Sequence, residues 1–201
     1  MKFLYWLAWI TFGAAFRSFL GLRIDGREHL VTEGPVLVAA NHQSFLDPPL
    51  IGCLYDMPLF YLARKTLFSG FTNWLYRQWN ALPVDQDKPD MASLKSIIRL
   101  LKAGHGVVIF PEGARTLDGS LGEAAPGIGL VAAKSGAVIQ PVRIRGAFEA
   151  LPRGASWLRL ARVSVCIGPA IRLTPDDLTH ASGREGYALL AKRIMSAIAA
   201  L

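Results

Sequence analysis

The sequence contains few cysteines and few charged residues. Its two cysteines in 201 residues, Cys53 and Cys166, cannot form the set of disulfides that stabilises small secreted domains. The four histidines are scattered and have no cysteine neighbours, so no metal site is expected. Only 18% of the residues are charged, whereas about a quarter is typical of soluble domains. The composition is therefore apolar for a freely soluble protein.

Acidic residues are also scarce, and this gives the chain a positive charge. The 22 lysines and arginines outnumber the 15 acidic residues, which leaves a net charge of +7. Such a charge favours anionic partners, namely nucleic acid, anionic lipid headgroups or phosphorylated substrates. The basic residues are scattered along the chain, and nucleic-acid binding would leave the apolar N-terminus unexplained. We therefore expect no nucleic-acid partner.

The N-terminal segment has no acidic side chain before Asp25 and is almost wholly apolar from Phe3 to Phe16. A helix of that length would extend about 21 Å, less than the thickness of about 30 Å of a bilayer's hydrocarbon core. Its few polar residues do not gather on one face of the helix. We predict that residues 1–24 form a membrane-associating helix that lies in the interface, with Arg17 and Arg23 reaching the headgroups.

Three alternatives remain for this segment. It could be a cleavable signal peptide, for which Gly13-Ala14-Ala15 is a weak cleavage site. It could be a helix that packs only against its own domain. A full crossing of the membrane would require the helix to continue through Arg17.

Residues 25–201 alternate between runs typical of strands and runs typical of helices. Strands are expected at residues 36–40, 107–110, 138–144 and 163–167. Helices are expected at residues 49–54, 90–103, 127–134 and 184–201, with Asp90 as an N-cap. This alternation predicts a single layered domain of the α/β class, with a mostly parallel or mixed sheet flanked by helices and preceded by the apolar N-terminal helix.

An unusual polar motif follows the first predicted strand. His42 and Asp47 are five residues apart, which places them about 140° apart on a helix and on opposite faces of a strand. They can touch only across a turn, and Asn41 and Ser44 are residues that favour turns. If the two side chains do not touch, Asp47 would be the N-cap of the following helix, and His42 would be a half-buried polar residue at the end of the strand. Together, they would form a dyad in which one imidazole nitrogen is fixed and the other can accept a proton.

The sequence offers no obvious nucleophile for such a dyad. It has no G-x-S-x-G motif, and Ser44 is too close to His42 along the chain to be an obvious triad partner. The attacking hydroxyl is therefore expected to belong to a substrate.

A second motif, Phe110-Pro111-Glu112-Gly113-Ala114-Arg115-Thr116, follows another predicted strand. Such a stretch could be an ordinary turn. An arginine beside backbone amides exposed at a glycine can also bind a phosphate. Sites in α/β sheets tend to lie beyond the carboxyl ends of strands, where both His42 and Glu112 stand.

The two motifs together resemble those of the glycerolipid acyltransferase family, whose familiar members are the 1-acylglycerol-3-phosphate acyltransferases. The block N-H-x-S-x-x-D is matched by residues 41–47. The block F-P-E-G-T-R-S is matched by residues 110–116, with Ala114 and Thr116 as substitutions. An apolar strand centred on proline is matched by residues 138–142. The likeness covers about residues 25–170.

The resemblance implies an enzyme that moves a fatty acyl chain from acyl-CoA or acyl carrier protein to the hydroxyl of a lysophospholipid. The reaction most strongly implied is the conversion of 1-acylglycerol-3-phosphate to phosphatidate in phospholipid biosynthesis. It would need no cofactor beyond the acyl donor. His42 would be the general base, and Asp47 would orient it. The residues expected to bind substrate are Asn41, Ser44, Lys65, Glu112, Gly113, Arg115 and Pro141. The partners would be the membrane and the two substrates, at the cytoplasmic face of the cell membrane, in a peripheral or monotopic mode.

Two positions depart from the family pattern. Gln86 stands where the family often has an arginine, and Ala125 stands where a basic residue often precedes Pro126-Gly127. These departures leave open a lysolipid with a different headgroup. A lipid-binding protein that keeps the fold without catalysis is a further alternative.

Apolar and basic stretches suggest where lipid would bind. Residues 50–62 and the aromatic cluster of residues 68–79 could form an acyl tunnel, an interfacial rim or simply core. The basic side chains of Arg153, Arg159 and Arg162 could meet lipid headgroups or a phosphate of CoA.

Overall fold

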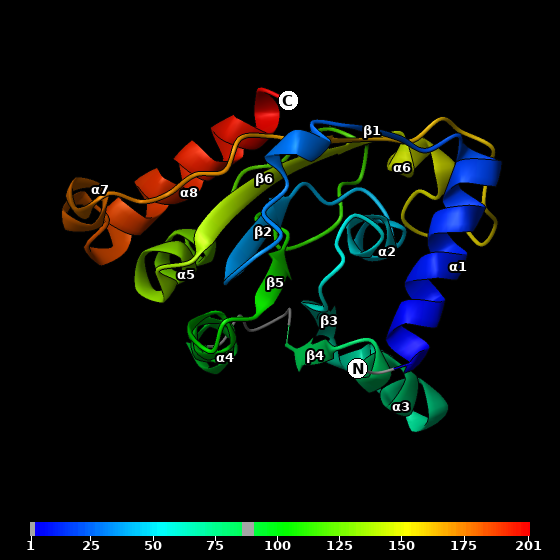
Figure 1. The fold of residues 1–201 in the computed structure, drawn as a ribbon, viewed down its shortest axis with the longest axis horizontal. Helices are drawn as coiled ribbons and strands as arrows, with labels where there is room; N and C mark the ends of the chain where they lie inside the picture. Colours follow the sequence, from blue (N-terminus) through cyan, green and yellow to red (C-terminus); the bar gives the residue numbers. More distant parts are fainter. Residues whose placement is uncertain (1–2, 86–90) are drawn as a thin grey trace.

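The computed structural model describes residues 3–85 and 91–201, so the expectations for Gln86 and Asp90 lie outside the described residues. The described chain forms a sheet of seven strands in the order β1-β7-β6-β2-β5-β3-β4 (Figure 1). The strands are β1 (Arg23–Asp25), β2 (Val36–Ala40), β3 (Leu59–Arg64), β4 (Ala81–Val84), β5 (Gly106–Ile109), β6 (Val138–Arg145) and β7 (Ser164–Ile167). Only the β6–β7 pair is antiparallel among these described strands. The expected α/β fold with a mixed sheet is confirmed.

Helices cover both faces of this sheet (Figure 1). The helices are α1 (Phe3–Leu20), α2 (Asp47–Gly52), α3 (Gly70–Gln78), α4 (Met91–Lys102), α5 (Gly127–Ser135), α6 (Ala147–Ala150), α7 (Pro175–His180) and α8 (Gly183–Ala199), with short 3-10 turns η1 (Arg27–His29) and η2 (Lys65–Leu67). Helices α1 and α2 pack on one face, whereas α4, α5 and α8 pack on the other. All five residues of β2 are buried, as expected for a central strand covered on both faces.

The strands and helices predicted within residues 25–201 agree with the structure to within two residues at each described end. The N-terminal helix, predicted over residues 1–24, ends earlier, at Leu20, and Arg23 begins strand β1. Strands β1, β3 and β4 and helices α3, α6 and α7 were not predicted. The proline at position 83 argued against a strand there, because proline is tolerated chiefly at sheet edges, and β4 is one of the two edge strands of the described sheet. Helix α3 was missed because it is short. It begins at a capping box between Ser69 and Thr72.

The domain covers only one side of α1. Tyr5, Trp9 and Phe16 are buried in the core between α1 and the sheet. On the other side, Ile10 is 68% exposed and Phe19 is 65% exposed. By length and composition α1 could cross a membrane. Removing α1 would expose a large part of the core, so the signal-peptide alternative conflicts with the packing.

Candidate active site

The turn after β2 begins at Asn41, whose side chain forms hydrogen bonds with the backbone of the neighbouring strand β6. Asn41 Nδ2 donates to the carbonyl oxygen of Ile144 at 2.9 Å, and the Ile144 amide donates to Asn41 Oδ1 at 2.7 Å. Both bonds are buried, so the Asn41 side chain pairs with the β6 backbone in place of a ladder residue. The main chain is thereby free to leave the sheet and turn at His42.

Asp47 closes this turn. Its side chain is fully buried, and its Oδ2 lies 2.7 Å from His42 Nδ1. The same oxygen accepts the backbone amides of Gln43 at 2.6 Å and Ser44 at 2.7 Å. The dyad hypothesis required His42 and Asp47 to meet, and they do. The N-cap alternative for Asp47 is wrong, because Leu46 holds that position and the Asp47 side chain points back into the turn.

His42 is held from several sides. Its ring stacks on Phe110, with 3.9 Å between ring centres and 13° between the planes. Its backbone amide donates to Glu112 Oε1 at 2.9 Å, and its carbonyl accepts the Thr116 amide at 2.9 Å. Because the Asp47 carboxylate accepts a hydrogen bond from His42 Nδ1, that nitrogen carries the proton of the ring. His42 Nε2 therefore keeps the lone pair that a base needs.

Two carboxyl groups in this region balance burial against hydrogen bonds. Burial raises the pKa of Asp47, while the bonds from His42, Ser44 and Gln43 act in the opposite direction. Burial likewise raises the pKa of Glu112, and the amides of His42 and Gly122 oppose it. In both groups burial outweighs the hydrogen bonds, so the net shift of the pKa is upward.

Glu112 joins two loops. One oxygen accepts the His42 amide, and the other accepts the Gly122 amide at 3.1 Å. The carboxylate thus fixes the loop after β5 against the histidine turn. Gly113 follows with φ of +71°, a left-handed conformation that favours glycine. The Glu112-Gly113 pair therefore shapes the backbone around His42.

Arg115 presents an unused hydrogen-bond donor. Its guanidinium carbon lies 3.6 Å from the centre of the Phe45 ring, and its Nη1 is buried with no hydrogen-bond partner. Burial lowers the pKa of Arg115, and the nearby Arg153 lowers it further. Two close guanidinium groups with an unmet donor are suited to binding an anion such as a phosphate.

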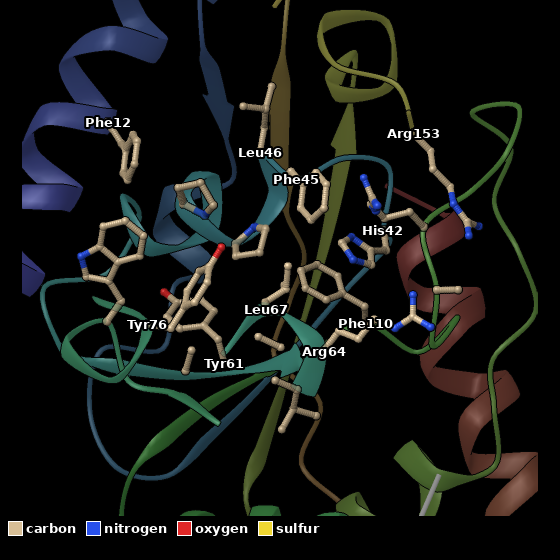
Figure 2. Close-up of a pocket in the computed structure, with 18 of the residues that line it drawn as sticks. Phe12, His42, Phe45, Leu46, Tyr61, Arg64, Leu67, Tyr76, Phe110 and Arg153 are labelled. Carbon is tan, nitrogen blue, oxygen red and sulfur yellow. The ribbon is translucent and has the colours of Figure 1, made fainter. Parts of the chain in front are cut away.

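A cavity of about 560 Å³ connects these groups to an apolar region. This volume lies within the usual range of ligand sites, roughly 300–1,000 Å³. Figure 2 shows His42 near the middle, Arg153 towards one side, and Phe12 and Tyr76 towards the other. The aromatic side chains that line it are Trp9, Phe12, Phe16, Phe45, Tyr61, Tyr76, Trp79 and Phe110. The cavity therefore has a basic end and an aromatic end, with an imidazole between them.

Comparison with known proteins identifies the family. The family described as Acyltransferase matches residues 21–145 of the chain. The chain belongs to the acyltransferase family. This confirms the resemblance seen in the two motifs, and the match includes both of them.

Several named relatives of this acyltransferase-family protein are 1-acyl-sn-glycerol-3-phosphate acyltransferases. The chain is 30% identical over 191 residues to chloroplastic LPAT1 of Arabidopsis thaliana, covering 93% of this chain and 54% of that protein. It is 26% identical over 183 residues to the enzyme of Bacillus subtilis, covering 87% and 84% respectively.

A solved structure is also similar to this family member. The crystal structure of the 1-acyl-sn-glycerophosphate acyltransferase PlsC from Thermotoga maritima superposes with a TM-score of 0.74 at 25% identity, covering 95% of this chain and 77% of that one. Against LPAT1 and chloroplastic BAT2 of Brassica napus, the chain spans about half of the relative's length, 54% and 46%.

Of the seven residues expected to bind substrate in this acyltransferase-family protein, Arg115 lines the cavity. The other six lie elsewhere. Ser44 Oγ donates to the Leu151 carbonyl at 2.7 Å, and Pro141 lies buried in β6 opposite Ala39. Lys65 is exposed in η2, while its neighbour Arg64 lines the cavity. Asn41, Glu112 and Gly113 shape the backbone, as described above.

Sequence reasoning missed other cavity residues of this family member. The second motif includes Phe110 but gives it no role of its own, although its ring stacks on His42. Phe45 holds the Arg115 guanidinium and lies within the first motif at a position the family pattern leaves open. The aromatic residues of α1 gave no local signal that they would line a cavity, because only the packing of α1 against Tyr61 of β3 and against Trp79 brings them there.

Proposed function

We propose that this protein is a membrane-associated O-acyltransferase that moves a fatty acyl chain from an acyl thioester to the hydroxyl of a lysophospholipid. The observation that carries the proposal is His42, which is bound to Asp47 through one nitrogen and lies on a cavity with one aromatic end and one basic end. A fatty chain suits the aromatic end, and a phosphate suits Arg115 and Arg153.

The proposed reaction needs one base and no protein nucleophile. His42 Nε2 takes the proton from the acceptor hydroxyl as its oxygen attacks the thioester carbonyl. The new C–O bond forms, the C–S bond of the tetrahedral intermediate breaks, and the imidazolium returns the proton to the departing thiolate. Asp47 stabilises the imidazolium during this cycle. The scheme uses protein side chains alone, so no cofactor is proposed beyond the acyl donor, which would be acyl-CoA or acyl carrier protein.

We propose 1-acylglycerol-3-phosphate as the first acceptor to test. Relatives of this protein are named 1-acyl-sn-glycerol-3-phosphate acyltransferases. In addition, the buried Nη1 of Arg115, which has no hydrogen-bond partner, can donate to a phosphate. The exposed Ala125 supplies no charge where the family often has a basic residue. This observation favours, as a second candidate, a lysolipid whose headgroup needs fewer cationic contacts.

We further propose that residues 1–24 hold the protein at the cytoplasmic face of the membrane in a monotopic mode. The outer side of α1 exposes Phe3, Leu7, Ile10 and Phe19. On α3, Phe71 is 70% exposed and Trp74 is 48% exposed. Exposed aromatic side chains at one edge of a molecule are typical of interfacial binding. A substrate with a fatty chain would then reach the cavity from the bilayer.

The test is an acyl-transfer assay with a panel of lysolipids. Purified protein is incubated with labelled acyl-CoA or acyl carrier protein and with lysolipids bearing phosphate, glycerol, choline or ethanolamine headgroups. We expect product from lysophosphatidate in the wild type and none above background in His42→Ala. Arg115→Ala should raise KM for lysophosphatidate more than for lysophosphatidylcholine.

Two outcomes would contradict the proposal. Lipid binding without any acyl product, across all donors and acceptors, would favour a non-catalytic lipid-binding protein. Equal turnover by the wild type and by His42→Ala would remove the proposed base.

A further inference from the structure

The segment from Pro152 to Arg162 exposes three large apolar side chains close together. Trp157 is 83% exposed, Leu158 is 51% exposed and Leu160 is 84% exposed. The described backbone here forms neither helix nor strand. Neighbouring large apolar side chains left in solvent indicate an interaction surface.

Both ends of this segment are tied to the candidate active site and to α1. At one end, the Leu151 carbonyl accepts the Ser44 hydroxyl of the histidine turn at 2.7 Å. At the other end, the Val163 amide donates to the carbonyl of Leu20, the last residue of α1, at 3.1 Å. Figure 1 shows this gold-coloured segment beside the C-terminal end of α1. The exposed residues Trp157, Leu158 and Leu160 form the apolar tip of this segment. The tip is therefore held near the end of α1 that exposes Phe19.

The charges around the tip indicate which partner it fits. Arg153, Arg159 and Arg162 belong to the segment, and the chain has no acidic residue from Ala150 to Pro175. Tryptophan and leucine surrounded by arginine are typical of segments that enter the interface of an anionic bilayer. A protein partner would not require this uniform positive charge.

We propose that residues 152–162 are a second membrane-inserting element, which enters the headgroup region of an anionic bilayer together with α1. Arg153 of the same segment lines the cavity, so insertion brings one wall of the cavity to the bilayer surface. A lysolipid could then move from the bilayer into the cavity without crossing water. This inference rests on the proposed function and adds a surface to it.

The first test measures binding to vesicles by co-sedimentation. The triple variant Trp157→Ser, Leu158→Ser and Leu160→Ser should bind vesicles of phosphatidylcholine and phosphatidylglycerol about tenfold more weakly than the wild type, because it loses the apolar area that this segment inserts beside α1. The matched control is Leu189→Ser, which removes an apolar side chain 65% exposed on α8 and should bind like the wild type.

Charge variants test the choice of partner. The double variant Arg159→Gln and Arg162→Gln should lose the preference for vesicles containing phosphatidylglycerol over vesicles of phosphatidylcholine alone. Unchanged vesicle binding by the triple variant would overturn the proposal. Absence of vesicle binding by the wild type would overturn it as well. The proposal would also fail if the wild type were a dimer that the triple variant converts to a monomer, because a second copy would then cover the tip.

Fluorescence tests whether Trp157 itself enters the bilayer. Vesicles with brominated lipid chains should quench the emission of the wild type more than that of Trp157→Phe, which stays apolar but loses that fluorophore. Equal loss of emission in the two proteins would place Trp157 outside the bilayer and overturn the proposal.

An activity assay separates this inference from the proposed function. With a short-chain lysophosphatidate kept monomeric in water, the triple variant should be as active as the wild type. With the acceptor in vesicles, its rate should fall about tenfold, in line with its binding. Absence of turnover in every protein would count against the acyltransferase function alone, since the vesicle-binding and quenching results would still decide the role of the segment.

Discussion

The two faces of the sheet carry cores of different kinds. On the face covered by α4, α5 and α8, the buried side chains are largely aliphatic, as at Ile97, Ile139 and Ile194. In those three described helices, no buried side-chain nitrogen or oxygen lacks a hydrogen-bond partner. On the face covered by α1 and α2, aromatic side chains surround a cavity, and Trp6 Nε1 and Tyr55 Oη are buried without a partner.

This difference separates stability from function. Close-packed aliphatic layers maximise contacts, whereas a cavity loses contacts along its wall and an unpaired buried polar atom costs free energy. The α4, α5 and α8 face should therefore supply much of the free energy of unfolding, and the α1 and α2 face should supply binding and chemistry. Four substitutions test this division.

The largest expected effect is on the rate, at the cavity face. His42→Ala should lower turnover by about 10²–10⁴-fold, because general-base catalysis contributes that much. The melting temperature should fall only modestly, since the His42 side chain lies on the cavity and the backbone amides of Gln43 and Ser44 still donate to the buried Asp47. Acyl-transfer rates and thermal unfolding measured on the same samples check both parts. A large loss of stability would show that the dyad belongs to the core.

The opposite pattern is expected on the other face. Ile194→Ala should lower the free energy of unfolding by about 2–5 kcal/mol, because Ile194 is fully buried among aliphatic side chains. Urea denaturation measures this change. Below the unfolding transition the variant should keep the wild-type turnover, and a strong loss of rate would contradict the division between faces.

A smaller loss of stability is expected where α5 crosses α8. A Cβ at Gly129 would collide with the backbone carbonyl of Tyr187, so Gly129→Ala should cost about 1–3 kcal/mol as the helices separate. Gly127→Ala in the same helix is the control, because its Cβ would meet only the flexible end of Leu94, at 3.4 Å. Equal stability of the two variants in urea would show that the crossing is not tight.

The smallest expected effect concerns the ring beneath the candidate base. Phe110→Leu removes the stack on His42, which is worth about 0.5–1.5 kcal/mol, and should lower kcat by roughly two- to tenfold with little change in KM. Phe60→Leu is the control, because Phe60 packs against His105 on the other face. A change in KM alone would assign Phe110 to substrate binding rather than to positioning His42.

Much of the fold was predictable from local patterns. Helices α4 and α8 have clear periodicity, strand β2 is a short apolar run and α5 an apolar run that a glycine ends, and the predicted bounds of all four lie within two residues of the observed ones. Strand β3 was hidden inside a longer apolar run, and the proline in β4 argued against a strand. Short elements of this kind gain most of their stability from neighbours in the sheet, which a local pattern does not contain.

The site was predictable in part. The spacing of His42 and Asp47 showed that they could meet only across a turn, because no regular helix or strand would bring them together, and the structure shows that they do meet. Asn41, Ser44 and Glu112, which were expected to bind substrate, each form hydrogen bonds with backbone groups, and their binding roles stay a prediction. Residue type and motif position show that a polar side chain is needed, but not which partner it meets.

The sequence by itself therefore determined the family and the alternating architecture, since both depend on residue order, whereas the contact between His42 and Asp47 was one of two alternatives until the structure showed it. Only the tertiary structure decided which groups line the cavity. Trp9 and Phe12 on α1, Trp79 near α3 and Arg153 after β6 are far apart along the chain. They form one lining because the sheet order and the packing of α1 bring them together, and such long-range contacts leave no periodic signal in the sequence.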